Sequence, residues 1–396
     1  MRFLFLVCCS LTFNIVFGQT AVEYLNSYRI KSGLIPLEVN PVISASVKDH
    51  TRYMYVNSVL NHKEKARDSL FSGRTADVRA INRGYHCRFV SENLAYNEKD
   101  SLSAVDELFS TVYHRLSLLD FRFNQVGYAA TGHYYGFVLG NSYLDSVCAA
   151  TKENKSLVSF LYVVNLCDNF NKKVDLVDYL DAIQKVEKQN ASIVTFPYSG
   201  QDNVPTYFSE EDPKPWPKCN IMGYPVSVQF NEYYHSGVRL VSFKLRDGRG
   251  KRVKTKLLTP DNDPNKMLLP GQYVLIPYKV LNLNETYKAF VVYRENGERF
   301  SFSWTFHTQT YQNLFVLEGD QTVYVPSPAV FYVYVRPSSC EDSLFNSLDI
   351  KYTTQVFNVE FVNSLILRVQ VKGEDGQFGQ ILMPNGYNLK VIILGE

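Results

Sequence analysis

Three ionisable side chains within residues 90–129 could act together in chemistry. Glu92 lies in the run V-S-E-N-L-A-Y, and Glu107 and His114 follow it, seven residues apart from each other. Seven residues are roughly two helical turns, so Glu107 and His114 would point the same way if one helix contained both. A carboxylate and an imidazole on one polar face could bind a divalent ion. His62, farther upstream, would complete a small polar cluster if the fold brought it there.

A helix over residues 103–112 would carry Glu107. Ser103 and Asp106 have the spacing of a pair that caps the start of a helix. The apolar residues of this run recur at the spacing of one helix face, and they are Val105, Leu108, Phe109 and Val112.

Two earlier helices would position His62. The first is expected over residues 21–32, closed by a glycine. Asn40 and Pro41 are typical of the start of a second helix, which we expect to continue to about residue 59 and to deliver His62 just past its end. His50 lies inside that helix, where we expect a hydrogen bond to hold it, and not a metal.

A small antiparallel sheet should follow. The β-branched and aromatic runs 126–130, 134–139 and 157–164 predict strands, with an insertion at residues 140–155 between the last two. Helical spacing returns at 174–186. Helices around an antiparallel sheet indicate an α+β sandwich over residues 19–195.

The composition changes at residue 196. Residues 196–222 are rich in proline and turn residues, and we interpret them as a linker that lies on the domains it joins. Residues 223–310 alternate in the manner of an immunoglobulin-like β-sandwich, and residues 311–396 repeat the pattern, which predicts a second small antiparallel β-sandwich.

Five short motifs occur in an order that resembles the CAP superfamily in its bacterial, SCP-like form, over residues 20–190. The motifs are L-N-S-Y-R-I-K-S-G-L-I-P-L-E-V-N-P (25–41), N-H-K (61–63), R-A-I-N-R-G-Y (79–85), S-E-N-L-A-Y (91–96) and H-R-L-S-L-L…F-N-Q-V-G-Y (114–128). The resemblance implies an α-β-α layered domain, which agrees with the α+β interpretation.

The resemblance also implies a cavity formed by two histidines and two glutamates. His62, Glu92 and His114 match three of these positions, and the helix-face argument makes Glu107 the candidate for the fourth. This set would hold zinc or another divalent metal. The chain departs from the family around His114, where T-V-Y-H-R replaces the common S-x-G-H-R, and Leu108 replaces the usual tryptophan. The alternative is a scaffold network in which histidines and carboxylates pair with one another.

The resemblance favours a secreted binding protein whose cleft holds a divalent metal or a small apolar, lipid-like ligand. The β modules would present the cleft or contact a surface protein or glycan. One alternative is a metal-dependent hydrolase that uses the same cleft, although neither G-x-S-x-G nor H-E-x-x-H occurs. Another alternative is a surface adhesin in which residues 223–396 make the contacts.

The compartment can be predicted from the N-terminus and the cysteines. Residues 1–18 have the layout of a secretory signal peptide, and no later stretch is long and apolar enough to span a membrane, so we expect a secreted, periplasmic or cell-surface protein. In an oxidising compartment we expect Cys148 and Cys167 to form a disulfide, because they flank one segment between two predicted strands. The other cysteines past the signal are Cys87, Cys219 and Cys340.

Net charge and sequons add two further constraints. A net charge of +2 without a basic block argues against a nucleic-acid partner. Three N-x-S/T sequons, at Asn154, Asn190 and Asn284, matter only in a host that glycosylates them.

Overall fold

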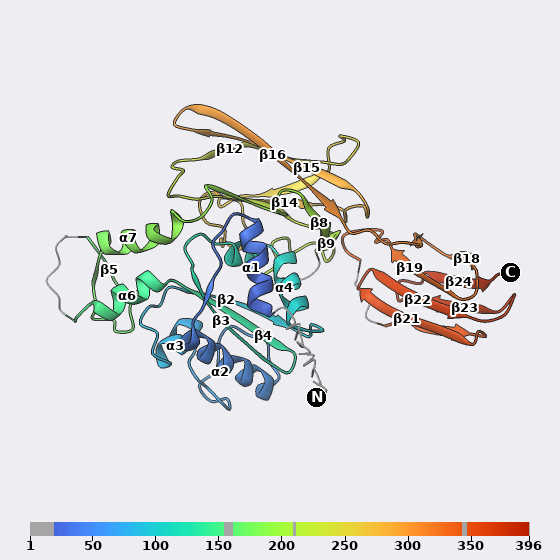
Figure 1. Ribbon diagram of the computed structural model, residues 1–396, viewed down its shortest axis with the longest axis horizontal. Coiled ribbons are helices and arrows are strands. Elements are labelled where there is room, and N and C mark those ends of the chain that lie inside the picture. The colour runs from blue at the N-terminus through green and yellow to red at the C-terminus, as the bar shows by residue number, and fades with distance from the viewer. Residues whose placement is uncertain (1–19, 154–160, 209–210, 343–346, 396) are drawn as a thin grey trace, which may run out of the picture.

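The computed structural model describes residues 20–153, 161–208, 211–342 and 347–395, which form three parts (Figure 1). An N-terminal part of helices around a small sheet is followed by two β-sandwiches, and the C-terminal sandwich projects from the side of the molecule. The predicted α+β fold with two sandwiches is therefore confirmed. The expected signal peptide and the sequon at Asn154 lie outside the described residues. Among the helices described, none is long and apolar enough to cross a membrane.

The sheet of the N-terminal part has the strand order β1-β3-β4-β2. Its strands are β1 (Glu38–Val39), β3 (Gln125–Thr131), β4 (Tyr134–Gly140) and β2 (Val90–Tyr96). β3 and β4 form a hairpin that matches two of the predicted strands, and β2 pairs antiparallel with β4 along its whole length. β2 consequently carries Glu92 at the edge of the sheet.

One face of this sheet is covered by α2 (Pro41–Asn57) and the short helix α3 (Ala76–Asn82). α2 begins where predicted, with the Asn40 side chain accepting the first free backbone N–H groups. It lies so close to β3 that a Cβ on Gly127 would come within 2.5 Å of the backbone of Ile43, so this strand position requires glycine. α3 lies within the polar stretch between α2 and β2, whose sequence gives no helical pattern.

The opposite face is covered by α1 (Ala21–Lys31), α4 (Ser101–Ser110) and α5 (Tyr113–Leu118), which completes an α-β-α sandwich. Apolar side chains of these helices pack in one buried cluster with side chains of β4, and the cluster includes Leu25, Val105, Phe109, Leu118, Phe137 and Leu139.

The predicted cap of α4 was wrong. The side chain of Asp100 caps this helix by accepting the backbone N–H groups of Leu102 and Ser103. Asp106 instead accepts hydrogen bonds from the hydroxyls of Tyr24 and Tyr28 on α1, at 2.8 and 2.7 Å. The aspartate therefore joins two helices and does not start one.

The predicted disulfide between Cys148 and Cys167 is present. Cys148 lies in the helix α6 (Ser142–Ala150), which occupies most of the segment that was predicted to be an insertion. The predicted strand over residues 157–164 lies partly outside the described residues. Its described part contributes only β5 (Tyr162–Val163), which pairs with β6 (Val174–Asp175) and not with the main sheet.

The helix α7 (Leu176–Glu187) is followed by a buried amide that fastens it to the domain. The side-chain N–H groups of Asn190 donate to the carbonyls of Phe121 and Val186, at 2.9 and 3.0 Å. Its side-chain oxygen accepts the backbone N–H of Ile35. All three bonds join segments that are distant in the sequence or end a helix, so Asn190 is a structural residue.

The middle sandwich consists of the sheets β13-β14-β11-β7 and β12-β15-β16-β8. Two of these strands come from the region around residue 196 that was assigned to the end of the first domain and to the linker, so this region is part of the sandwich. The strands are β7 (Ile193–Phe196), β8 (Gln201–Val204), β11 (Val226–Phe230), β12 (Arg239–Arg246), β13 (Thr255–Leu258), β14 (Gln272–Pro277), β15 (Thr286–Glu295) and β16 (Glu298–Thr308).

The remainder of the predicted linker forms a two-stranded ribbon, β9 (Tyr207–Phe208) with β10 (Met222–Gly223). The C-terminal sandwich consists of the sheets β17-β19-β22-β21 and β18-β24-β23-β20. Its strands are β17 (Leu314–Leu317), β18 (Gln321–Val325), β19 (Ala329–Val335), β20 (Asp349–Tyr352), β21 (Val356–Asn363), β22 (Ile366–Lys372), β23 (Phe378–Leu382) and β24 (Asn388–Ile393).

The sequence predicted two antiparallel sandwiches, but each sandwich also contains at least one parallel pair of strands. β8 pairs parallel with β16, β17 with β19, and β18 with β24. β8, β17 and β18 each lie at the edge of a sheet, where a single crossing chain can add to it.

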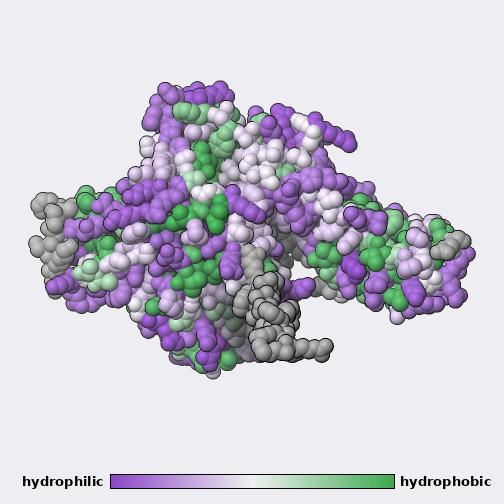
Figure 2. Space-filling view, viewed as in Figure 1, coloured by the Kyte–Doolittle hydropathy of each residue, from purple (hydrophilic) through white to green (hydrophobic). Residues whose placement is uncertain are grey.

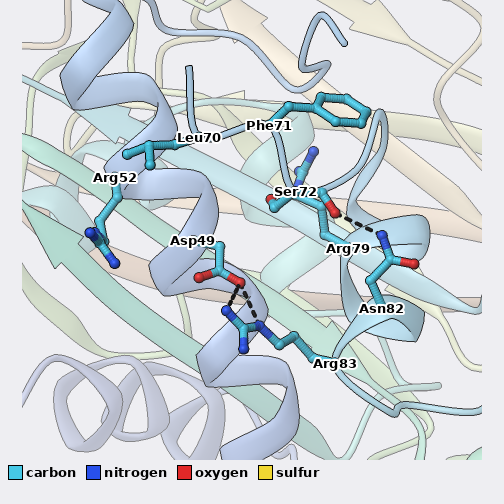
Figure 3. A pocket seen from close by; sticks show the side chains of 8 residues that line it. All are labelled: Asp49, Arg52, Leu70, Phe71, Ser72, Arg79, Asn82 and Arg83. Atoms are coloured by element: carbon cyan, nitrogen blue, oxygen red, sulfur yellow. Dashed lines mark hydrogen bonds and ion pairs between the residues drawn. The ribbon is translucent and has the colours of Figure 1, made fainter. Parts of the chain in front are cut away.

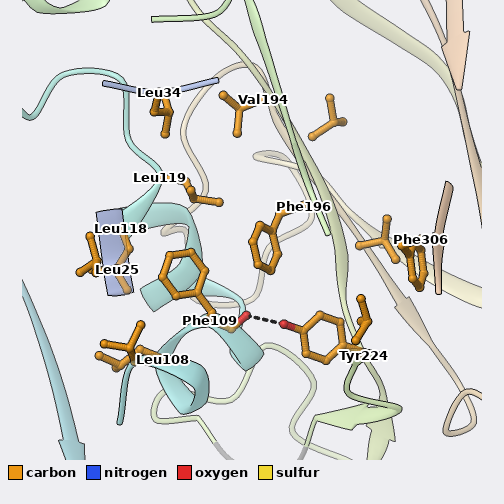
Figure 4. Packing of buried hydrophobic residues seen from close by; sticks show 14 of the residues in the cluster. Leu25, Leu34, Leu108, Phe109, Leu118, Leu119, Val194, Phe196, Tyr224 and Phe306 are labelled. Atoms are coloured by element: carbon orange, nitrogen blue, oxygen red, sulfur yellow. Dashed lines mark hydrogen bonds between the residues drawn. The ribbon is translucent and has the colours of Figure 1, made fainter. Parts of the chain in front are cut away.

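The N-terminal part and the middle sandwich share one hydrophobic core (Figure 4). Phe109 of α4 packs against Phe196 of β7, with ring centroids 5.1 Å apart. The hydroxyl of Tyr224 donates to the carbonyl of Phe109. Between them lies the fully buried Arg115, whose guanidinium faces the rings of Phe196 and Tyr224 and donates to the carbonyls of Phe109, Ser110 and Pro225.

The joint to the C-terminal sandwich is different in kind. A second disulfide, Cys219–Cys340, connects the end of the segment 196–222, which was predicted to be a linker, to this sandwich. The buried apolar residues at this joint form a small cluster of Ile221, Tyr334, Leu365 and Ile366, and the sandwich has a separate core of its own. On the face shown in Figure 2 the C-terminal sandwich projects beyond the rest of the molecule.

Candidate functional site

His62 and Glu92 come together as the sequence predicted. His62 follows the end of α2, and its Nδ1 lies 2.9 Å from Oε2 of Glu92 on β2. The His62 side chain is 50% exposed, whereas that of Glu92 is 5% exposed. The pair is therefore a buried carboxylate that orients an imidazole at the surface.

Arg79 of α3 is the residue that sequence reasoning missed. Its Nη2 donates to Oε1 of Glu92 at 2.5 Å, and its Nη1 donates to the carbonyls of His62 and Gly73. The guanidinium is buried, with a side chain only 1% exposed. The residues R-A-I-N-R-G-Y were noted as a motif, but an arginine in a short helix gives no sign of its partner before the chain folds.

A second acid–imidazole pair lies behind the first. Nδ1 of His50 lies 2.8 Å from Oε1 of Glu64, and Nε2 lies 2.9 Å from the carbonyl of Asn61. Glu64 also accepts hydrogen bonds from the backbone N–H groups of Ser72 and Gly73 and from the hydroxyl of Ser72. Both ring nitrogens of His50 therefore have a hydrogen-bond partner, which fixes the orientation of this buried ring.

Both carboxylates are held in the charged form. Burial acts to raise the pKa of Glu92, but the hydrogen bond from His62 and the charge of Arg79 outweigh it, and the pKa lies below its ordinary value. The pKa of Glu64 is likewise lowered, because the bonds from His50 and Ser72 outweigh its burial. Both anions therefore lie beside the same buried cation, Arg79, whose guanidinium is 2.5 Å from Glu92 and 3.9 Å from Glu64.

The structure does not unite Glu107 and His114 on one helix, so that prediction was wrong. α4 ends at Ser110, Thr111 is extended, and α5 begins anew at Tyr113. The helix is interrupted because Glu211, from the former linker region, accepts the backbone N–H groups of residues 112–114. Nδ1 of His114 lies 3.2 Å from the same carboxylate.

His114 also lies on the wrong side of the sheet to reach Glu92. Ser91 and Asn93, the neighbours of Glu92 on β2, both bond the hydroxyl of Ser117 on α5. Successive strand residues point to opposite faces, so Glu92 points away from α5 toward α2 and α3. Over the described part of the chain, no three His, Cys, Asp or Glu side chains are placed to hold a metal ion.

The residues present at the His62–Glu92 pair do not fit a divalent cation. Both oxygens of Glu92 already accept bonds from within the protein, and the cationic Arg79 is in direct contact with one of them. A second positive ion would be repelled by the guanidinium and would have to displace it. The arrangement corresponds to the scaffold network that the sequence left open as an alternative to metal ligation.

The N-terminal part is also recognisable by comparison. The model of the cysteine-rich secretory protein family, CAP, matches residues 22–144. No curated protein sequence matches the chain.

Several of the solved structures that are similar to parts of the chain are bacterial surface or secreted proteins. Among them are an extracellular protein with an SCP domain from Bacillus anthracis (18% identity, 30% of this chain and 38% of that chain, TM-score 0.28), an outer surface protein from Borrelia burgdorferi (18%, 29% and 83%, 0.25) and a cysteine-rich secretory protein from Staphylococcus aureus (18%, 30% and 36%, 0.24). The chain thus spans less than two fifths of the length of the Bacillus and Staphylococcus proteins. On the family match, residues 22–144 form a CAP domain, the domain that the sequence motifs predicted.

Proposed function

We propose that this chain is an exported binding protein whose CAP domain takes a small lipid-like ligand at the open side of His62. The observation that supports this is the half-exposed imidazole fixed by a buried network. Its Nδ1 is bound to Glu92, and Nε2 has no hydrogen-bond partner among the described residues. A surface side chain whose rotamer is fixed from below loses little entropy on binding, which is how binding sites are preorganised.

Export is supported by two features. Residues 1–18 have the pattern of a signal peptide, and the chain carries the disulfides Cys148–Cys167 and Cys219–Cys340, which persist in oxidising compartments. Mass spectrometry of protein recovered from the medium or cell surface should find an N-terminus near Gln19. An N-terminus at Met1 would contradict export through a cleaved signal.

The ligand proposal is tested with a neutral probe, a fluorescent long-chain alcohol titrated into the pure protein. We expect saturable binding that His62→Ala weakens about tenfold or more, the loss of roughly 1.4 kcal/mol of contact energy. His133→Ala is the matched control, because His133 is an exposed histidine in the turn between β3 and β4. Absence of binding, or equal binding by His62→Ala, would overturn the proposal.

The metal expectation has its own test. Calorimetric titration of zinc into chelator-free protein at neutral pH should give no heat that depends on His62, because Arg79 already fills the role of the cation. A stoichiometric zinc site that is lost in His62→Ala would restore the metal.

A hydrolase is the second candidate, favoured by the carboxylate-oriented imidazole itself. Such a histidine can act as a general base. No serine, threonine or cysteine of the described chain has a hydrogen bond to His62, so the base would have to act on water. Turnover of a general ester or peptide substrate that disappears in His62→Ala but persists in His114→Ala would favour the enzyme.

A further inference from the structure

A groove opens beside the His62–Glu92 network and shares Arg79 with it. It has a volume of about 360 Å³ and lies between α2, α3 and the loop of residues 70–72 (Figure 3). This size is within the range of small-ligand sites. Its lining residues are Asp49, Arg52, Leu70, Phe71, Ser72, Arg79, Asn82 and Arg83.

Of the charged side chains that line the groove, Arg79 contacts Glu92 and Arg83 pairs with Asp49, which leaves the positive charge of Arg52. Three arginines and one aspartate line it. Nε and Nη2 of Arg83 both lie 2.5 Å from Oδ2 of Asp49, which fixes the direction of this guanidinium. Arg52 on α2 is exposed and has no carboxylate partner among the described residues, so its charge is available to an anion.

The loop opposite these arginines supplies an apolar wall. Leu70 and Phe71 are both exposed large hydrophobic residues, and in Figure 3 Leu70 lies at the same end of the groove as Arg52. Leu70 has a φ of +61°, a left-handed conformation that is uncommon for leucine. The backbone is thus held where it presents two adjacent apolar side chains to solvent.

The buried network fixes this loop at both ends. Glu64 accepts the backbone N–H groups of Ser72 and Gly73, and the hydroxyl of Tyr53 donates to Asp68 at 2.6 Å. Arg79 links this loop to the His62 site, because it donates to the carbonyls of both Gly73 and His62. The wall of the groove is therefore in place before a ligand arrives.

We infer that this groove takes the anionic head group, phosphate or carboxylate, of the lipid-like ligand. Arg52 and Arg83 contact the anion, and Leu70 and Phe71 contact the start of its apolar chain. The inference rests on the proposed function and adds the class of head group. Guanidinium groups favour carboxylate and phosphate because they donate paired N–H groups in a plane.

The test compares three probes by calorimetry: dodecyl phosphate, the neutral alcohol dodecanol, and inorganic phosphate. We expect dodecyl phosphate to bind at least tenfold more tightly than dodecanol at low salt, and this preference to shrink as salt is added. Arg52→Gln should reduce the preference to about threefold or less, whereas Arg239→Gln, which changes an exposed arginine of β12, should preserve it. Both variants change surface residues, and circular dichroism checks that they fold.

The outcomes separate the two proposals. Equal binding of dodecyl phosphate and dodecanol, or a preference unaffected by Arg52→Gln, would overturn the anionic head group and leave the proposed function standing. Binding of neither amphiphile would remove both. The remaining measurements distinguish a lipid head group from a free anion. If the ligand is a lipid, Phe71→Ser should weaken the binding of dodecyl phosphate but not the binding of inorganic phosphate. Inorganic phosphate that binds as tightly as dodecyl phosphate, without an effect of Phe71→Ser, would restrict the site to a free anion and overturn the lipid assignment.

Discussion

The two joints of this molecule connect its three parts by different means. Between the CAP domain and the middle sandwich, apolar side chains of both parts form one continuous core around the buried Arg115. Between the middle and C-terminal sandwiches there is a disulfide, Cys219–Cys340, and a cluster of four buried apolar residues. The C-terminal sandwich also has an independent core.

This difference teaches which parts should unfold together. Parts that share a core lose buried apolar area from both sides when either one opens, so the CAP domain and the middle sandwich should behave as one cooperative unit. The C-terminal sandwich should unfold separately, because most of its buried apolar residues belong to a core of its own. Amide hydrogen exchange read by mass spectrometry resolves the two units by peptide.

The largest expected effect comes from removing the residue at the centre of the shared core. Arg115→Ala leaves the carbonyls of Phe109, Ser110 and Pro225 without their donor and vacates a fully buried volume, which should cost on the order of 3–5 kcal/mol. Urea denaturation followed by hydrogen exchange should show the CAP domain and the middle sandwich destabilised together. Arg239→Ala should change stability by less than about 0.5 kcal/mol. Loss of protection confined to the CAP domain would contradict the shared unit.

Opening the second joint should have a more local effect. Replacing both Cys219 and Cys340 by serine removes a crosslink over 121 residues of sequence, and such bonds contribute about 2–4 kcal/mol. We expect faster exchange at residues 216–222 and 336–342 and easier proteolytic release of the C-terminal sandwich. The urea concentration at which half of the CAP domain and middle sandwich is unfolded should not change. A fall in that concentration would show that the second joint also couples the folding of the parts it connects.

A substitution inside the CAP domain should destabilise the CAP domain and the middle sandwich, but not the C-terminal sandwich. Glu64→Gln removes a buried anion and should cost about 1–3 kcal/mol. The pKa of Glu64 is lowered from 4.5, so its ionised form stabilises the fold above that pH, and the stabilisation is lost as pH falls through the lower folded value. The difference between wild type and Glu64→Gln should therefore be full at pH 6 and should shrink below about pH 4.

For Glu64→Gln, amide hydrogen exchange compares the loss of protection in the three parts of the molecule. Peptides of the middle sandwich should lose protection with those of the CAP domain, while peptides of residues 347–395 should not. Equal loss in all three parts would remove the distinction between the joints.

The smallest expected effect is at Cys87, a free cysteine that is buried in the CAP domain. Burial raises the pKa of its thiol to about 12, so the native protein should not react with a thiol reagent at pH 8. Labelling of Cys87, identified by peptide mass, should follow the opening of the first unit. The rate should be unchanged when Cys219 and Cys340 are both replaced by serine, and an increase would mean that the C-terminal sandwich protects the CAP domain.

The sequence predicted those features whose cause is local. The cap at Asn40 and Pro41, the β3–β4 hairpin and the pairing of Cys148 with Cys167 follow from neighbouring residues or from one short segment. The motifs also placed His62 and Glu92 in one domain, and the structure brings their side chains into contact.

The rest depended on partners that lie far apart in the chain. Nothing near His114 indicates that Glu211, 97 residues later, takes the backbone N–H groups that would have continued the helix. Arg79 and Glu64 look like ordinary charged residues of a polar stretch until α3 and the loop bring them together. The side of the sheet on which Glu92 lies is decided by strand register, and one residue of register exchanges the two faces.

The buried amide of Asn190 has a consequence for how the protein can be produced. Attaching a sugar to its side-chain nitrogen would consume one N–H group, and the chain folded around it leaves only 4% of the residue exposed. In a host that glycosylates nascent chains, an oligosaccharide at this sequon and the docking of α7 would exclude each other, whereas Asn284 is exposed and could carry one without such conflict. Every sugar added at Asn190 during synthesis would therefore yield a molecule unable to complete its CAP domain.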